Sequence, residues 1–303
     1  ARLWYGAVRV RGDIVATLGA MFGAEPVKSL FGLPICADLS KLDAEIAVLG
    51  AGGCVPYDSV GFYCAGGPAA IRAAAAEYAA NLLHMNFDLG GPVLPKGVRA
   101  VDCGDMRVEA SDPEGNRARM IGAVSRIIDR GAVPVVIGGD DSVPSPMIEA
   151  LGGRKRKFTI LQIDAHIDWR DEVGGQRWGL SSTMRRASEM GHIERIIQVG
   201  QRGIGSARLA DVREARAWGV HFIPGGEVAR DGVGRAVSLI PDGAEVIVCL
   251  DLDALDPSVM PAVIGRTAGG MSYWQVLELV AAAAQIGRIA AFDMVEFMPD
   301  RDI

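Results

Sequence analysis

The densest group of chemically active residues in the sequence is Asp164-Ala165-His166-Ile167-Asp168, which directly follows the apolar run Phe158–Ile163. Side chains alternate along an extended chain, so Asp164, His166 and Asp168 would project from one face if the strand continued through them. Two carboxylates and an imidazole are suitable ligands for a divalent metal ion. The alternative interpretation is a polar strand end that faces water.

A second acidic motif follows the apolar run Val246–Leu250. Asp251 and Asp253 would again share one face, and two aspartates at the end of an apolar run need a reason because Asp is depleted in strands. Metal binding would supply that reason. The next residues, Asp256-Pro257, are more typical of a turn.

The third motif is Gly138-Gly139-Asp140-Asp141-Ser142, which follows Val133–Ile137. Its glycines would let the backbone approach a site closely. Asp141 could then be a ligand. Alternatively, Asp141 or Ser142 could cap the short segment that comes next.

Eight short runs are nearly continuous in Val, Ile, Leu and Ala, as is typical of strands covered on both faces in a parallel sheet. These runs are Glu45–Leu49, Val98–Asp102, Val133–Ile137, Phe158–Ile163, Ile196–Val199, Val220–Ile223, Val246–Leu250 and Ile289–Phe292. Helical segments are expected between them at Pro68–Leu83, Arg117–Arg130, Ala207–Trp218 and, after a Ser272/Gln275 capping box, Val276–Ile286. This alternation predicts one α/β domain over residues 1–303, with residues 1–40 as an N-terminal arm. The absence of an initial Met and the ending Arg301-Asp302-Ile303 lead us to expect trimming at both ends.

In open α/β sheets, ligands bind outside the carboxyl ends of the strands, so we expect the three motifs to meet there. The candidate metal ligands are Asp141, Asp164, His166, Asp168, Asp251 and Asp253. Carboxylates gathered in one place repel one another strongly without compensation. Two divalent ions bridged by a hydroxide would leave a net charge of about −2 and would provide a nucleophile. Such a site would favour a cationic substrate.

The motifs resemble those of the ureohydrolases, which include arginase, agmatinase and related guanidino-acid hydrolases. The resemblance rests on Gly66-Gly67-Pro68-Ala69-Ala70-Ile71-Arg72, Gly138-Gly139-Asp140-Asp141-Ser142, Asp164-Ala165-His166-Ile167-Asp168, Asp251-Leu252-Asp253-Ala254-Leu255-Asp256-Pro257 and Asp293-Met294-Val295-Glu296. It implies a three-layer α/β/α sandwich with a mainly parallel eight-stranded sheet. It also implies two manganese ions, or nickel in some relatives, hydrolysis of a guanidinium group to urea and an amine, and assembly into trimers or hexamers.

The same resemblance implies a role for each ligand. Asp164, Asp168 and Asp251 would bridge or bind both metals, and His166 and Asp253 would complete the set. Asp168 would also hold the bridging hydroxide and pass its proton to the leaving nitrogen.

On the substrate side, the resemblance implies that Glu296 pairs with the guanidinium, a planar cation that a carboxylate matches well. Two departures from the family pattern stand out. Asp141 replaces a histidine, which makes the ligand set harder and favours manganese, and the loop Trp178–Arg186 has no histidine. These departures motivate a second hypothesis, a non-catalytic or weakly active subunit that works with a homologous chain.

Composition excludes several other classes of protein. The net charge of −6 argues against nucleic acid as a partner, and no apolar run is long enough to span a membrane. Five cysteines without a C-x-x-C spacing indicate buried thiols in a reducing compartment such as the cytoplasm.

A two-metal phosphoesterase would need Lys or Arg near the metals, and the motifs supply none. The aromatic segment Pro56–Tyr63, which contains Tyr57 and Asp58, could be a plain turn or a loop that lines the mouth of a substrate pocket and sets specificity. His84, His192 and His221 are expected to be structural or surface residues.

Overall fold

A single eight-stranded sheet forms the centre of the molecule in the computed structural model, which describes residues 18–21 and 27–302. The strands are β1 Ile46–Gly50, β2 Ala100–Asp105, β3 Val133–Ile137, β4 Phe158–Ile163, β5 Ile193–Val199, β6 His221–Ile223, β7 Glu245–Asp251 and β8 Arg288–Val295. All neighbouring strands are parallel, in the order β2-β1-β3-β8-β7-β4-β5-β6. Each predicted apolar run corresponds to one strand, so the predicted parallel sheet is confirmed.

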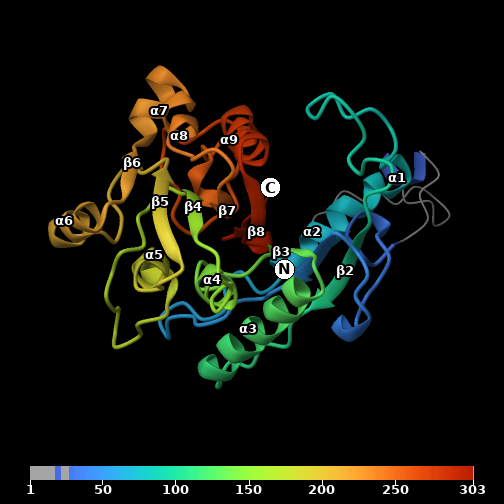
Figure 1. Cartoon of the computed structure of the whole chain (residues 1–303), viewed down its shortest axis with the longest axis horizontal. Coiled ribbons are helices and arrows are strands. Elements are labelled where there is room, and N and C mark those ends of the chain that lie inside the picture. Colours follow the sequence, from blue (N-terminus) through green and yellow to red (C-terminus); the bar gives the residue numbers. More distant parts are fainter. Residues whose placement is uncertain (1–17, 22–26, 303) are drawn as a thin grey trace.

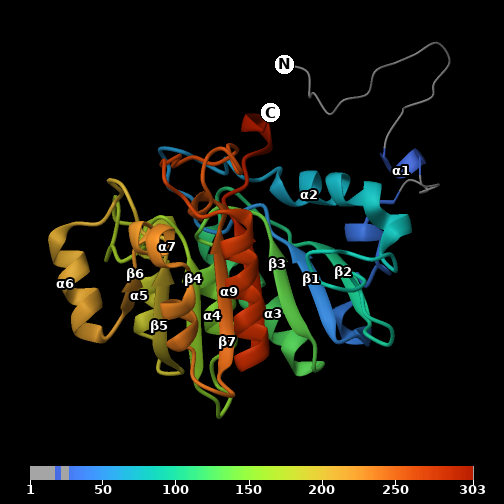
Figure 2. The ribbon, with the colours of Figure 1, turned by 90° about the horizontal axis from the view of Figure 1, so that it is seen from above.

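Helices cover both faces of the sheet, as the two perpendicular views show (Figures 1 and 2). The α-helices are α1 Leu18–Met21, α2 Gly67–Ala75, α3 Pro113–Asp129, α4 Pro144–Ala150, α5 Thr183–Ser188, α6 Leu209–Trp218, α7 Gly225–Asp231, α8 Gly234–Ser238 and α9 Tyr273–Ile286. Short 3-10 helices occur at η1 Leu30–Gly32, η2 Leu39–Lys41, η3 Ala76–Asn81, η4 Leu180–Ser182, η5 Leu252–Ala254 and η6 Pro299–Arg301. Figure 1 shows α9 on one side of the sheet and α3 and α4 on the other, which is the expected three-layer arrangement.

The core is divided between the two faces because successive strand residues point in opposite directions. On β4, Ile160 belongs to the cluster that contains Met120 of α3 and Met147 of α4. The next residue, Leu161, belongs to the cluster that contains Leu279 of α9. Burial of each such side chain stabilises the fold by about 1.5–3 kcal/mol. The central strands are therefore held from both sides and give the loops at their ends a fixed base.

The helix bounds differ from the sequence-based expectation most clearly at two of the predicted helices. The segment expected as one helix over Pro68–Leu83 changes from α-helix to the 3-10 helix η3 at Ala76. None of the η3 side chains is fully buried, so packing does not hold this alanine-rich stretch in α geometry. Helix α3 begins four residues before the expected Arg117, because Asp112 caps it by accepting a hydrogen bond from Gly115 N. The predicted capping box of Ser272 and Gln275 is confirmed.

The strand order determines where the functional loops lie. Strand β8 is inserted between β3 and β7, and β7 pairs with β4, so the carboxyl ends of these four strands are adjacent. On the other side of β3, the segment 34–36 runs beside the edge strand β2, where Asp102 N donates to Pro34 O and Cys36 N donates to Asp102 O. The rest of the expected 1–40 arm before residue 27 lies outside the described residues, apart from α1. No helix within the described part of the chain is long and apolar enough to cross a membrane.

Candidate metal centre and active site

Buried acidic residues gather at the carboxyl ends of the four adjacent central strands. Asp141 follows β3, Asp164 and Asp168 follow β4, Asp251 ends β7, and Glu296 follows β8. Each of these side chains is at most 5% exposed. A burial this deep is exceptional for carboxylates, which remain buried in proteins when they are paired or coordinate a metal.

Five of the six predicted metal ligands fall into two groups that could each hold an ion. One group is Asp164, His166 and Asp253, and the other is Asp141, Asp164 and Asp168. The potential ligand atoms within each group lie within 4.8 Å of one another. Because Asp164 belongs to both groups, two ions at these places would share it as a ligand.

Asp251, the sixth predicted ligand, belongs to neither group in the part of the chain that the structure describes. Its Oδ1 instead accepts a hydrogen bond of 2.7 Å from Asp253 N. The side chain is nevertheless in the same acidic cluster, because the charges of Asp253, Asp164, Glu296 and Asp141 all raise its pKa after burial, the largest cause. Its role as a ligand stays a prediction.

The predicted geometry of the two Asp motifs is wrong in detail. Strand β4 ends at Ile163, before Asp164, and Asp168 has a left-handed backbone with φ of 43°. The residues of this motif therefore meet in a folded loop and not along an extended strand. Asp253 likewise lies in the 3-10 helix η5 and does not continue the strand beyond Asp251.

Gln162 lies at the end of β4, and the structure places it directly beneath the carboxylates. Its Nε2 donates to Asp164 Oδ2 and to Asp168 Oδ2, both at 2.6 Å. Gln198 Nε2 in turn donates to Gln162 Oε1 and, at 2.9 Å, to Ile167 O. Sequence reasoning assigned neither glutamine a role. Each is a buried amide within a mainly apolar run, and this is the sequence signal that could have identified them as supports of the site.

Arg202 supports the site from the other side by holding the turn that carries Asp253. The hydrogen bonds of its guanidinium group go to main-chain oxygens of Asp253 at 2.7 Å and of Ala254 and Leu255 at 3.1 Å. The same group donates to Thr267 O at 2.8 and 3.1 Å. Arg202 therefore joins two loops around one potential ligand, and sequence reasoning did not find it because its partners are main-chain atoms.

The electrostatics of the cluster favour the binding of a cation. Burial, followed by the charges of neighbouring carboxylates, raises the pKa of Asp141 and Asp168 well above the ordinary value. Burial alone would lower the pKa of His166, but its hydrogen bonds and ion pairs with Asp164 and Asp253 outweigh this effect and raise it to about 11. Asp141 Oδ2 is buried without a hydrogen-bond partner among residues 18–21 and 27–302. Oxygen donors, an imidazole and an unpaired buried carboxylate oxygen fit a divalent cation.

Glu296 lies next to this cluster with its two carboxylate oxygens in different environments. Its Oε1 accepts hydrogen bonds from Asp141 N at 2.8 Å and from Tyr63 Oη at 2.7 Å. Its Oε2 is buried without a partner in the described part of the chain. Tyr63 ends the aromatic loop that the sequence placed at the mouth of a substrate pocket, but its contact with Glu296 was not foreseen, because the two residues lie far apart in the sequence.

The backbone at two predicted catalytic residues is strained. Among the described non-glycine residues, only Phe31, Asp168 and Glu296 have positive φ, with 43° at Asp168 and 72° at Glu296. Side chains other than glycine adopt this conformation at a cost, and such residues concentrate at functional sites. This backbone strain does not depend on charge, and it indicates a functional role for Asp168 and Glu296, the same two residues that the sequence motifs suggested.

The loop with Tyr57 and Asp58 contacts the loop that lacks the histidine. Tyr57 Oη accepts a hydrogen bond of 3.1 Å from Ser181 N, whereas Asp58 is exposed. Ser181 and Ser182 are both buried. Roles for Tyr57 and Asp58 in substrate binding stay predictions.

Local contacts decide the roles of several further residues. Asp141 and Ser142 do not cap the following helix, because α4 has Val143 at its N-cap and no side-chain cap. Asp256 is a turn residue, as expected, and accepts hydrogen bonds from Ser258, Gly269 and Gly270. All five cysteines are free; Cys54, Cys64 and Cys249 are buried as expected, but Cys36 and Cys103 are partly exposed. The remaining histidines lie outside the two ligand groups: His84 is exposed, His192 contacts Ile148 O and His221 contacts Arg195.

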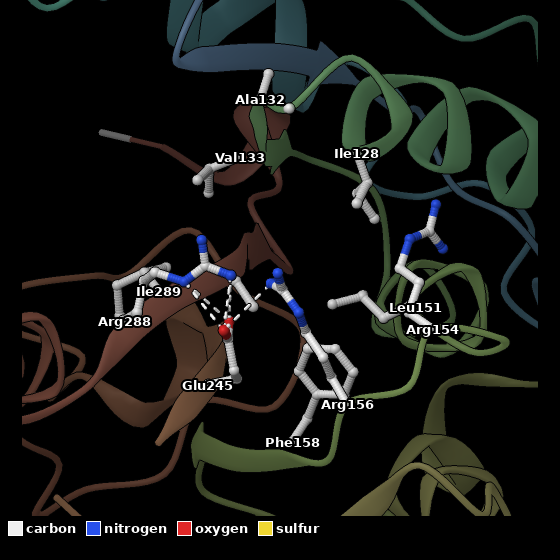
Figure 3. A pocket seen from close by; sticks show the side chains of 12 residues that line it. Ile128, Ala132, Val133, Leu151, Arg154, Arg156, Phe158, Glu245, Arg288 and Ile289 are labelled. Atoms are coloured by element: carbon white, nitrogen blue, oxygen red, sulfur yellow. Dashed lines mark hydrogen bonds and ion pairs between the residues drawn. The ribbon is translucent and has the colours of Figure 1, made fainter. Parts of the chain in front are cut away.

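One cavity adjoins the acidic cluster, and another lies far from it. A cavity of about 450 Å³ beside His166 is lined by Arg202, Ile204 and Phe222, among others. A second cavity, of about 270 Å³, lies at the amino ends of β3, β4, β7 and β8, the opposite edge of the sheet. Figure 3 shows Arg288 and Arg156 directed at the single carboxylate of Glu245 there, and none of the described residues that line this second cavity belongs to a ligand group.

Comparisons with known proteins agree with this geometry. The sequence model that describes the arginase family matches residues 45–303 of this chain. An N(1)-aminopropylagmatine ureohydrolase of Thermus thermophilus is 32% identical over 249 residues, which cover 81% of each chain. The solved structure of proclavaminate amidino hydrolase from Streptomyces clavuligerus has a TM-score of 0.80 at 23% identity and covers 92% of this chain and 91% of its own. The structure of Trypanosoma cruzi formiminoglutamase with Mn2+ has a TM-score of 0.73 at 22% identity and covers 91% of this chain and 92% of its own. With its sheet order, its acidic motifs and this match over most of its length, the chain belongs to the arginase family.

Proposed function

We propose that this protein is a metal-dependent hydrolase that cleaves a C–N bond of a guanidino compound and releases urea, or a urea derivative, and an amine. The observation that carries the proposal is the pair of ligand groups that share Asp164, next to the unpartnered Oε2 of Glu296. The substrate would be agmatine-like, a guanidino acid, or a substituted guanidine or biguanide. The ureohydrolase activity named for the relative from Thermus thermophilus supports this class of reaction.

Two divalent ions would be held by Asp141, Asp164, His166, Asp168 and Asp253, with Asp251 adjoining them. Manganese is the preferred metal because the set consists mostly of hard oxygen donors, and nickel is the alternative. When bound, such ions would lower the pKa of a water molecule in the site, so that hydroxide would be available as the nucleophile near neutral pH.

The side chains of this chain supply the remaining steps. Glu296 Oε2 accepts an N–H of the guanidinium, which places the central carbon of the substrate over the cluster. Asp168, held by Gln162 at 2.6 Å, takes the proton released on attack and passes it to the leaving nitrogen. A neutral or anionic reacting group is disfavoured, because the buried site strengthens every uncompensated charge.

The test uses purified protein loaded with Mn2+ and a panel of agmatine, 4-guanidinobutyrate, arginine and methylguanidine, with urea release as the readout. Turnover of at least one compound is expected. The Glu296→Gln variant keeps the shape of the side chain but removes its charge and should raise KM, while the surface variant Asp242→Asn should behave like wild type. Failure of the metallated protein to release urea from every compound would contradict the catalytic proposal.

A second candidate function is that of a non-catalytic or weakly active subunit in a mixed oligomer. It is favoured by Asp141 at the position where the family has a histidine, and by the two buried serines, Ser181 and Ser182, in a loop without a histidine. Activation of a homologous chain on mixing, without turnover by this chain alone, would support it. A homotrimer or homohexamer is the corresponding assembly if the chain acts alone, and light scattering distinguishes these states.

A further inference from the structure

We propose that Tyr63 is a positioning residue that orients Glu296, so that Oε2 and not Oε1 faces the guanidinium of the substrate. The inference rests on the proposed function, because it concerns the residue that would bind the reacting group. It also predicts that the two oxygens of this carboxylate have different roles. Oε1 anchors the side chain, and Oε2 recognises the substrate.

The hydrogen bonds of Glu296 support these different roles. Tyr63 Oη donates to Oε1 at 2.7 Å and Asp141 N donates to the same atom at 2.8 Å. Oε2 is buried and receives no hydrogen bond within the described chain. A buried carboxylate oxygen without a donor is costly, so a ligand N–H that meets it is strongly favoured.

The main chain of Glu296 is already fixed before the side chain is considered. Its φ is 72°, and its N–H donates to Gly139 O at 2.8 Å, which joins the ends of β8 and β3. The remaining freedom is rotation about the side-chain bonds. Asp141 N and the Tyr63 hydroxyl approach Oε1 from two segments, and together they select one rotamer.

Tyr63 is suited to act only as a donor. Burial, followed by the nearby charges of Glu296 and Asp140, raises the pKa of its hydroxyl far above the ordinary value. The hydroxyl therefore keeps its proton and does not compete with Glu296 for the proton chemistry of the reaction. Its contribution is to orient a neighbour, which affects substrate binding more than the chemical step.

The chain offers a matched control for this contact. Tyr273 Oη donates to Asp88 Oδ2 at 2.8 Å, the same type of hydrogen bond, but both residues are exposed at the surface. The Tyr63→Phe and Tyr273→Phe variants each remove one oxygen atom from a tyrosine–carboxylate pair. Only the first should alter binding of a guanidinium.

The experiment measures KM and kcat for the best substrate in the panel, together with binding of guanidinium chloride at low millimolar concentration by calorimetry. Metal content and melting temperature confirm that each variant is folded and loaded. Tyr63→Phe should raise KM and the guanidinium Kd about tenfold, at the lower end for a hydrogen bond to a charged group. Its kcat should stay within about twofold of wild type.

A double-mutant cycle separates orientation from a general structural effect. In the Glu296→Gln background, the further change Tyr63→Phe should have almost no effect on KM, because the oriented charge is already absent. An equal penalty in both backgrounds, or an unchanged KM and Kd in Tyr63→Phe alone, overturns the positioning role while leaving the proposed function intact. Absence of both urea release and guanidinium binding in wild type overturns both proposals.

Discussion

Replacement of Asp141 by asparagine tests whether the acidic cluster holds two ions, and the result can be read from stability without any substrate. Asp141, Asp164 and Asp168 form one of the two ligand groups. The asparagine side chain would keep the size of the aspartate but lose its negative charge. The quantity to measure is the difference in melting temperature between protein in excess Mn2+ and protein in excess chelator.

The magnitude follows from linkage between binding and folding. An ion that binds only the folded protein stabilises it by about 2.7 kcal/mol at a hundred times its Kd, so two ions give about 5.4 kcal/mol. Loss of one ligand should weaken its ion at least about a hundredfold, which reduces that ion's share to about 0.4 kcal/mol. For 303 residues, an unfolding entropy of about 2.1 cal/mol/K per residue converts these energies to shifts of about 8 °C for wild type and about 5 °C for the variant.

The assay is differential scanning fluorimetry, with elemental analysis for the number of ions per chain. Asp140→Asn is the matched control, because Asp140 is adjacent and buried but outside the ligand groups, and it should keep the full metal-dependent increment. Asp141→His should also keep two ions, since an imidazole can replace the carboxylate as a ligand. An increment for Asp141→Asn that equals wild type, with two ions still bound, would show that Asp141 is not a ligand.

Three other predictions concern single residues of the same site. Asp168→Asn should lower kcat at least about a hundredfold, because proton transfer is lost. The melting temperature of the protein in chelator should stay the same or rise, because a charge that repels the other carboxylates is removed. Nearly wild-type turnover would exclude Asp168 from proton transfer. Arg202→Met should weaken Mn2+ binding about tenfold in a chelator competition, because the turn that carries Asp253 loses its anchor, whereas Arg216→Met beside the same cavity should not. Burial raises the pKa of Asp293 to about 8, so the folded metal-free protein binds this proton more tightly than the unfolded chain, whose pKa is about 3.9. The stabilisation that this proton gives the folded protein is complete below about pH 4 and is lost as the pH rises through 8. The melting temperature in chelator should therefore fall from pH 5 to 8, and it should fall less in Asp293→Asn. An equal fall of the melting temperature with pH in both proteins would refute the raised pKa of Asp293.

The parts of the fold that could be predicted are those in which a short stretch of sequence carries its own signal. Strand β3, Val133–Ile137, and strand β4, Phe158–Ile163, have the predicted bounds because a strand covered on both faces must be apolar almost throughout. The Ser272 capping box is equally local. The order of the strands was not predictable in this way, because β8 pairs with β3 and β7 through contacts between distant segments.

The candidate site shows the same limit. The ligand types after β3, β4 and β7 could be identified from sequence, but the expected extended geometry of Asp164 to Asp168 was wrong, because the positive φ of Asp168 depends on the surrounding packing. Tyr63 was placed in a candidate pocket loop but not linked to Glu296, and Arg202 was not found at all. The first meets its partner 233 residues away, and the second binds main-chain oxygens that carry no sequence signature.

The insertion of β8 between β3 and β7 also has a consequence for biosynthesis. During translation, β2, β1 and β3 can pair as one block, and β7, β4, β5 and β6 can pair as another, but the order of the sheet gives these blocks no shared edge until β8 has left the ribosome. Asp141 belongs to the first block and Asp164 to the second, so the nascent chain cannot assemble the full ligand set earlier. If the chain binds two ions as proposed, the second ligand group, which needs both Asp141 and Asp164, would be complete only after β8 has joined the two blocks.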